Sequence, residues 1–205
     1  KLSKRHGAMG VDAYRDELGY LPEAINNYLM RLGWGHGDEE IVSREQAIAW
    51  FELDGVGRSP SRFDFKKLEN LNGHYLREAD DSRLAAIAQP MIEAKLGRTL
   101  GDSEVEMLVK SMASLKPRAK STLGLAEGAM FLFEQRPLTL DEGAKALLEG
   151  DALELLESVS SALGGSSDWD EAALESAVRR VAEDAGLGLG KVAQPLRAAL
   201  TGRTT

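Results

Sequence analysis

The residues best suited to chemistry in this chain stand at its start, in the run Lys1-Leu2-Ser3-Lys4-Arg5. Two lysines three positions apart, with a serine between them and an arginine after, form a compact group of positive charges. A lysine ammonium fits between phosphate oxygens as a point charge, and a serine hydroxyl adds a rotatable donor. The run therefore suits a polyphosphate, although lysine-rich segments are also common as solvated surface, so both interpretations stay open on these residues alone.

Four blocks in order along the chain support the first interpretation. They are residues 1–8, residues 21–34 (Leu-Pro-Glu-Ala-Ile-Asn-Asn-Tyr-Leu and then Leu-Gly-Trp), residues 63–77, and residues 190–202 (Gly-Lys-Val-Ala-Gln-Pro-Leu-Arg-Ala-Ala-Leu-Thr-Gly). The first resembles the "KMSKS" loop of class I aminoacyl-tRNA synthetases, in the variant of the bacterial glutamyl-tRNA synthetases. The other three resemble the same family, and the last is the most specific. Residues 79–185 are less distinctive.

The resemblance implies a mainly α fold: a helical stem-contact region followed by two all-α anticodon-binding subdomains. The expected regions are 1–78, with the signature loop, then 79–136 and 138–205. It also implies that a catalytic domain with the "HIGH" motif precedes Lys1, that the last subdomain is truncated, and that these 205 residues alone are inactive.

Site residues follow from the same blocks. The resemblance assigns Lys4 to catalysis, with Lys1 and Ser3 beside it at ATP. It assigns Arg118 and Arg197 to the anticodon of the tRNA. We expect both arginines just outside helices, where a long side chain can reach an unstacked base. Lys67 is a candidate stem contact, and a solvated helix lysine is an equal alternative.

The implied partners are tRNA-Glu, ATP and glutamate, and the longer enzyme would use ATP with Mg²⁺. No cofactor is expected on this chain alone, and a monomer in the cytoplasm without membrane contact is expected. No metal site is predicted, because His6, His36 and His74 lack ligand spacing and there is no cysteine. Two alternatives remain: an enzyme that also charges tRNA-Gln, and a helical protein-interaction module with no role in RNA binding.

Composition is that of an ordinary soluble globular protein, with 43% apolar and 28% charged residues. The net charge of −8 is unfavourable for binding RNA as a whole. Three stretches, however, carry positive charge without acidic residues: 1–6, 116–120 and 190–203. Their distribution allows binding at defined points, although scattered surface cations would give the same pattern.

Helical periodicity, caps and breakers predict the elements. The expected helices cover 11–18, 22–32, 43–51, 64–77, 81–96, 102–115, 121–134, 140–148, 152–163, 169–185 and 191–200. Ser43 with Gln46, and Thr139 with Glu142, read as capping boxes. Pro137 marks a boundary, Gly186–Gly190 reads as a helix-to-helix turn rather than a phosphate loop, and 41–42 and 63 are candidates for short extended pieces. Core positions are expected for the apolar residues Met91, Met107, Met112, Met130, Phe131 and Phe133, and for the tryptophans Trp34, Trp50 and Trp169.

Overall fold

The structure is a computed structural model that describes residues 10–58 and 61–204. Its helices are short to medium in length and follow one another with brief connections. They are α1 (Val11–Asp16), α2 (Pro22–Arg31), α3 (Arg44–Trp50), α4 (Phe65–Glu78), α5 (Asp81–Leu96), α6 (Asp102–Leu115), α7 (Thr122–Ala129), α8 (Glu142–Leu147), α9 (Ala152–Gly164), α10 (Glu171–Asp184) and α11 (Leu189–Thr201), with 3₁₀ turns η2 (Leu53–Gly55) and η3 (Met130–Leu132). The predicted mainly α fold is confirmed.

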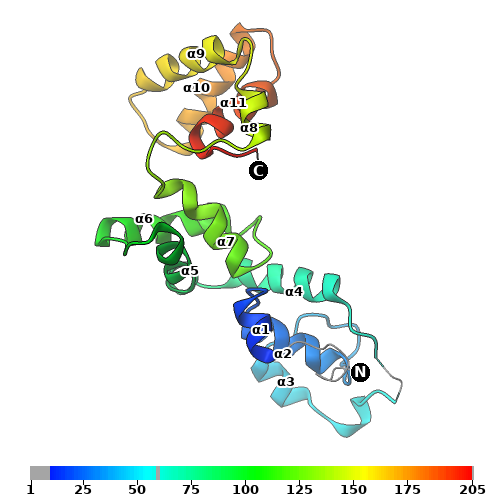
Figure 1. The fold of residues 1–205 in the computed structure, drawn as a ribbon. Helices are drawn as coiled ribbons and strands as arrows, with labels where there is room; N and C mark the ends of the chain where they lie inside the picture. The colour runs from blue at the N-terminus through cyan, green and yellow to red at the C-terminus, as the bar shows by residue number, and fades with distance from the viewer. Residues whose placement is uncertain (1–9, 59–60, 205) are drawn as a thin grey trace. The chain divides into compact units, whose positions relative to one another are not determined.

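Two compact units make up the chain. Unit 1 ends at Phe133, and unit 2 begins at Glu134, just before Pro137. Figure 1 shows the helices of each unit in the order of the chain. The division into three functional regions stays a prediction, because neither unit by itself shows what it binds.

The core of unit 1 is continuous across residue 78. Leu21 and Leu76 pack in one buried cluster with Leu84, Ile92 and Leu108. Helices α5, α6 and α7 contact one another, and α2 contacts α4. A second cluster around Tyr14, Tyr28, Leu68 and Leu71 holds the N-terminal helices together. Helix α4 therefore contributes one buried face to both clusters, which leaves its other face for solvent or a ligand.

Local sequence signals explain most helix starts in unit 1. The capping box at α3 is confirmed, since Gln46 N–H donates to Ser43 Oγ at 3.1 Å and Ser43 N–H donates to Gln46 Oε1 at 2.9 Å. Asp64 caps α4 as predicted, by accepting from the N–H groups of Lys66 and Lys67. Helices α5 and α6 have the predicted bounds. Pro117 follows α6 and cannot continue it, which agrees with the end of α6 at Leu115.

Unit 2 is a smaller helical group. Helices α9, α10 and α11 contact one another, and α8 packs on α11. Val159, Val178, Ala182 and Val192 form the buried cluster at their centre. Helix α11 contacts each of the other three helices of this unit (Figure 1).

The predicted capping box at Thr139 is wrong. Asp141 caps α8 by accepting from Ala144 N–H at 2.6 Å, because its own N–H donates to Gly202 O and holds it in an extended conformation. The glycine-rich segment is a turn as predicted, but α11 already begins at Leu189, so Gly190 is helical.

Two predicted core residues are exposed. Trp169 is 72% exposed, since it stands in the acidic loop before the cap of α10. Met107 is 40% exposed, because it lies off the stripe that buries Leu108 and Met112. The expected extended pieces form no strand in the described residues, where an isolated bridge pairs Trp34 with Val56 instead.

Candidate nucleic-acid interface

The predicted nucleotide-binding residues Lys1, Ser3 and Lys4 lie outside the described residues. Arg118, Arg197 and Lys67 lie within them, and all three have exposed side chains. Arg118 and Lys67 belong to unit 1, whereas Arg197 belongs to unit 2. Each unit therefore carries its own part of the candidate interface.

Arg118 sits in a loop that is fixed on both sides. Before it, Lys116 Nζ pairs with Asp81 Oδ1 at 2.7 Å and donates to Ala79 O at 3.1 Å. After it, Ala119 is buried and the carbonyl of Lys120 accepts from Asn72 Nδ2 at 2.7 Å. The Arg118 guanidinium has no partner among the described residues, so a rigid backbone presents one free planar donor fork.

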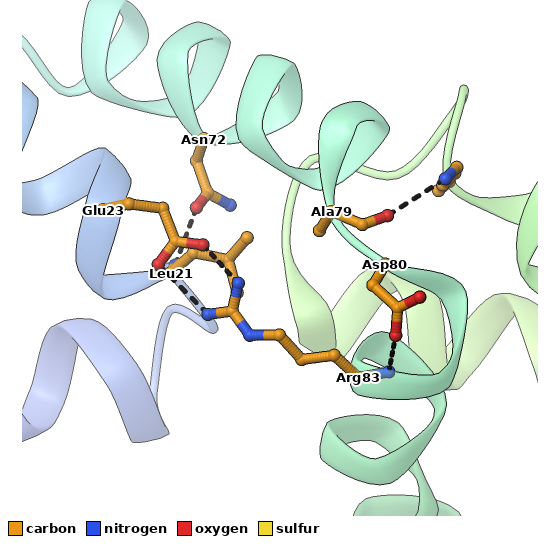
Figure 2. Close-up of polar contacts among 7 residues, drawn as sticks. Leu21, Glu23, Asn72, Ala79, Asp80 and Arg83 are labelled. Carbon is orange, nitrogen blue, oxygen red and sulfur yellow. Dashed lines mark hydrogen bonds and ion pairs between the residues drawn. The ribbon is translucent and has the colours of Figure 1, made fainter. Parts of the chain in front are cut away.

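Asn72 is the residue that locks this loop onto α4. It is fully buried, and its Oδ1 accepts from Leu21 N–H at 2.8 Å while its Nδ2 reaches Lys120 O. Figure 2 shows Asn72 pointing from α4 towards Leu21 at the start of α2. One amide side chain thus joins three segments of unit 1, and sequence reasoning missed this role because a single Asn carries no local pattern.

A second polar contact, between α2 and α5, lies close to this loop. Arg83 of α5 binds both carboxylate oxygens of Glu23, at 2.5 and 3.1 Å, and Asp80 caps α5 by accepting from Arg83 N–H (Figure 2). Burial raises the pKa of Glu23, but the hydrogen bond and charge of Arg83, with a backbone hydrogen bond, outweigh it and lower the pKa overall. The loop of Arg118 is therefore anchored to α5, and charge-assisted hydrogen bonds hold α5 against α2.

Arg197 projects from α11. Val192, Pro195 and Ala198 of this helix are buried, and Arg197 stands on the opposite, exposed face. The prediction that both arginines lie just outside helices is met by Arg118 and is wrong for Arg197, since α11 extends to Thr201. The backbone of Arg197 is thus held by helical hydrogen bonds, whereas the loop of Arg118 is held by side-chain bonds.

An open pocket of about 630 Å³ lies in unit 2 beyond the end of α11. It is lined by Gly202 and Arg203 and by residues of the segment before α8, namely Glu134, Gln135, Pro137, Thr139, Leu140 and Asp141. Arg203 pairs there with Glu134 at 3.7 Å. The pocket adjoins the last turn of the helix that carries Arg197.

Lys67 lies in the first turn of α4, where its backbone N–H donates to Asp64 Oδ1 at 3.2 Å. Its side chain makes no described contact. No group of three His, Cys, Asp or Glu side chains in the described residues could hold a metal ion. None of the described helices is long and apolar enough to cross a membrane.

Comparison with known proteins places the two parts of the chain. Residues 83–205 match the family described as anticodon binding domain, and residues 1–70 match the catalytic domain of class I tRNA synthetases (E and Q). Glutamate–tRNA ligase 2 of Rhizorhabdus wittichii is 64% identical over the whole chain, and glutamate–tRNA ligase 1 of Sphingopyxis alaskensis is also 64% identical over the whole chain. The chain spans 43% and 42% of these relatives.

Solved structures agree. A glutamate tRNA ligase from Elizabethkingia meningosepticum, crystallised with its amino acid, matches the whole chain with a TM-score of 0.76 at 29% identity, over 43% of its own length. The glutamate–tRNA synthetase of Elizabethkingia anophelis matches 94% of the chain with a TM-score of 0.69 at 31% identity, over 37% of its length. Over residues 83–205 the chain therefore belongs to the anticodon binding domain family, and over its whole length it is similar to part of the glutamate–tRNA ligases.

Proposed function

We propose that this chain is the tRNA-binding part of a glutamate–tRNA ligase and that it recognises the anticodon of tRNA-Glu. The anticodon binding domain match over residues 83–205, which includes the exposed Arg118 and Arg197, carries this proposal. The longer enzyme would attach glutamate to tRNA-Glu with release of AMP and pyrophosphate from ATP. It would work in the cytoplasm as a monomer.

Arg118 and Arg197 would read anticodon bases. Sequence-specific recognition of RNA targets unstacked loop bases, and an arginine fork can bind one base edge through two hydrogen bonds. The fixed backbones on either side of Arg118 and along α11 support this role, since little freedom is lost when each side chain binds. Arg118 would favour C over G at the last anticodon base, and Arg197 would hold a base nearer the first.

Binding experiments test this function directly. Wild-type protein is titrated by filter binding against tRNA-Glu and an unrelated tRNA at matched salt, and we expect clear preference for tRNA-Glu. Arg197→Ala should weaken tRNA-Glu binding by about 1–3 kcal/mol, with little change for a tRNA that lacks the glutamate anticodon.

Arg118→Gln should act on discrimination instead. It should narrow the affinity gap between tRNAs that end their anticodons in C and in G, more than it lowers affinity overall. Equal losses on both tRNAs would reduce Arg118 to a general electrostatic contact.

The signature run would act on ATP in the longer enzyme. Lys4 would stabilise the charge that develops as the adenylate forms, with Lys1 and Ser3 shaping the loop. Mg²⁺ would accompany ATP, and no step is assigned to it on this chain. Lys4→Ala in the longer enzyme should lower ATP–pyrophosphate exchange about a hundredfold and leave tRNA affinity unchanged. Loss of tRNA binding with normal exchange would contradict this assignment.

Lys67 would contact a phosphate of the tRNA stem from the first turn of α4. These 205 residues alone should make no glutamyl-adenylate, and exchange activity of the purified chain would contradict that. Charging of tRNA-Gln by the longer enzyme remains the alternative within this family, and the Arg118 experiment bears on it. A helical interaction module without RNA binding is disfavoured by the family matches.

A further inference from the structure

Two basic segments far apart in the sequence share one surface, on the face of α4 around Gly73. A Cβ atom built on Gly73 would lie 3.5 Å from Arg77 Nη1 and 3.5 Å from Lys120 Cδ. Arg77 is in the last turn of α4, whereas Lys120 belongs to the loop that follows α6. The missing side chain at Gly73 therefore leaves room for the Arg77 guanidinium and the aliphatic part of the Lys120 side chain to lie against the same point of this helix.

Hydrogen bonds hold Lys120 in this position. Its Nζ donates to Asn70 Oδ1 at 3.2 Å, one helical turn before Gly73. Its backbone carbonyl accepts from the buried Asn72 Nδ2. The lysine is thus fixed at its backbone and positioned at its tip, while its charge stays exposed.

Neither cation is neutralised by a carboxylate in the described part of the chain. Lys120 binds a neutral amide, and the Arg77 guanidinium makes no hydrogen bond or ion pair there. By contrast, Lys116 in the same loop is paired with Asp81, and Arg83 at the same junction is paired with Glu23. Two cations without a carboxylate partner on one face of α4 give that face a positive potential, which a bound anion would neutralise.

We propose that Arg77 and Lys120 form a binding site for an RNA backbone phosphate. An arginine fork and a lysine point charge together match the oxygens of a phosphate group. This inference rests on the proposed function, and it assigns a different role to each charged residue of the 116–120 loop. Lys116 anchors the loop, Arg118 reads a base, and Lys120 with Arg77 grips the backbone without regard to sequence.

The first experiment measures how tRNA affinity depends on salt. Arg77→Gln, Lys120→Gln and the double variant are compared with wild type, using tRNA-Glu and a tRNA changed only in its anticodon. Each substitution should reduce the slope of log affinity against log salt by about 1, and should weaken both tRNAs by the same factor. Arg44→Gln, which removes an exposed cation of α3 beside Glu45, is the matched control and should leave the slope unchanged.

A second experiment keeps both cationic side chains and adds a carboxylate next to them. Gly73→Glu places a carboxylate between them, and it stands four residues before Arg77, which is a favourable helical ion-pair spacing. Gly73 is buried, and the contacts of 3.5 Å leave room for a Cβ atom. The longer Glu and Gln side chains require the ends of Arg77 and Lys120 to move aside, so circular dichroism checks that both variants keep the fold. The salt slope should fall in Gly73→Glu and stay close to wild type in the neutral control Gly73→Gln.

The outcomes separate this site from the proposed function. Unchanged slopes in the double variant, with wild-type tRNA binding and an effect of Arg118→Gln on discrimination, would overturn the phosphate site alone. Equal slopes in Gly73→Glu and Gly73→Gln would also contradict it. Absence of tRNA binding by the wild-type chain would overturn both.

Discussion

In unit 1 and in unit 2, a hydrogen bond to a glycine carbonyl joins two segments that are far apart in the sequence, but the hydrophobic cores of the two units differ. In each, a left-handed glycine offers its carbonyl to a segment distant in the sequence: Gly19 O accepts from Thr122 N–H at 2.8 Å, and Gly202 O accepts from Asp141 N–H at 2.9 Å. A Cβ atom on Gly19 would lie 2.8 Å from Leu123 N, and one on Gly202 would lie 2.8 Å from Thr139 O. Both closures therefore require glycine.

The cores behind these closures differ in size. Unit 1 buries leucine, isoleucine and methionine side chains in one continuous cluster, and adds the buried polar residues Asn27, Asn72 and Thr122. Unit 2 centres on three valines and an alanine. Small cores supply little stability beyond the entropy they must offset. The same backbone strain should therefore disrupt the fold of unit 2 more than that of unit 1.

The largest effect is expected from Gly202→Ala in unit 2. The positive φ of 73° and the close approach to Thr139 O together should cost about 3 kcal/mol, most of what so small a core supplies. Amide hydrogen exchange should then show α8 and α11 losing most of their protection. Gly150→Ala is the control, since it has a φ of 63° but open space around it, and should cost only about 1 kcal/mol. Equal losses in both variants would rule out the contact with Thr139 as a cause.

Gly19→Ala should strain unit 1 by a similar amount and leave it folded. Protection of α1, α2 and α7 should fall about a hundredfold, which corresponds to roughly 3 kcal/mol, while α5 and α6 stay protected. The matched control is Gly97→Ala, with a φ of 68° and nothing near the added methyl group. Complete unfolding of unit 1 by Gly19→Ala would show that its larger core gives no advantage.

The smallest effect concerns acid, and it should appear in unit 1. Arg98 hydrogen-bonds Glu104, and with the N–H of Gly101 it lowers the pKa of Glu104 from 4.5 to about 2. A lowered folded-state pKa gives stability that is present above pH 4.5 and is lost as pH falls towards 2. Arg98→Gln removes the largest cause, so the urea midpoint of unit 1 should change less between pH 5 and about 2 than in wild type. The same acid dependence in both proteins would contradict the role of this pair.

Local features of the chain were accessible from the sequence, because they are encoded within a few residues. Ser43 and Gln46 form their capping box within four residues, and Pro117 prevents α6 from continuing, so neither feature depends on the rest of the fold. The predicted bounds of α5 and α6 hold because apolar period and helix breakers agree there. The exposure of Arg118 and Arg197 also follows the expectation, although their roles at the anticodon stay predictions.

Features that depend on distant segments were not accessible. The cap of α8 moves from Thr139 to Asp141 because Gly202, from the other end of unit 2, holds the backbone of Asp141. Asn72 matters because it meets Leu21 and Lys120, and Arg77 matters because Lys120 lies beside it. No residue near these positions in the sequence reveals such a partner.

The bond between Gly19 and Thr122 has a consequence for how the chain is made. The two residues are 103 positions apart, and the Thr122 hydroxyl also donates to Gly19 O, at 3.2 Å. At about 5–20 residues per second, the ribosome needs roughly 5–20 seconds to add the second partner after the first. During that time the carbonyl of Gly19 lacks both of its Thr122 donors, and the turn between α1 and α2 is held by local hydrogen bonds, such as the one from Tyr20 N–H to Tyr14 O at 2.9 Å. The attachment of this turn to the start of α7 is therefore completed only after 103 further residues have been added to the chain.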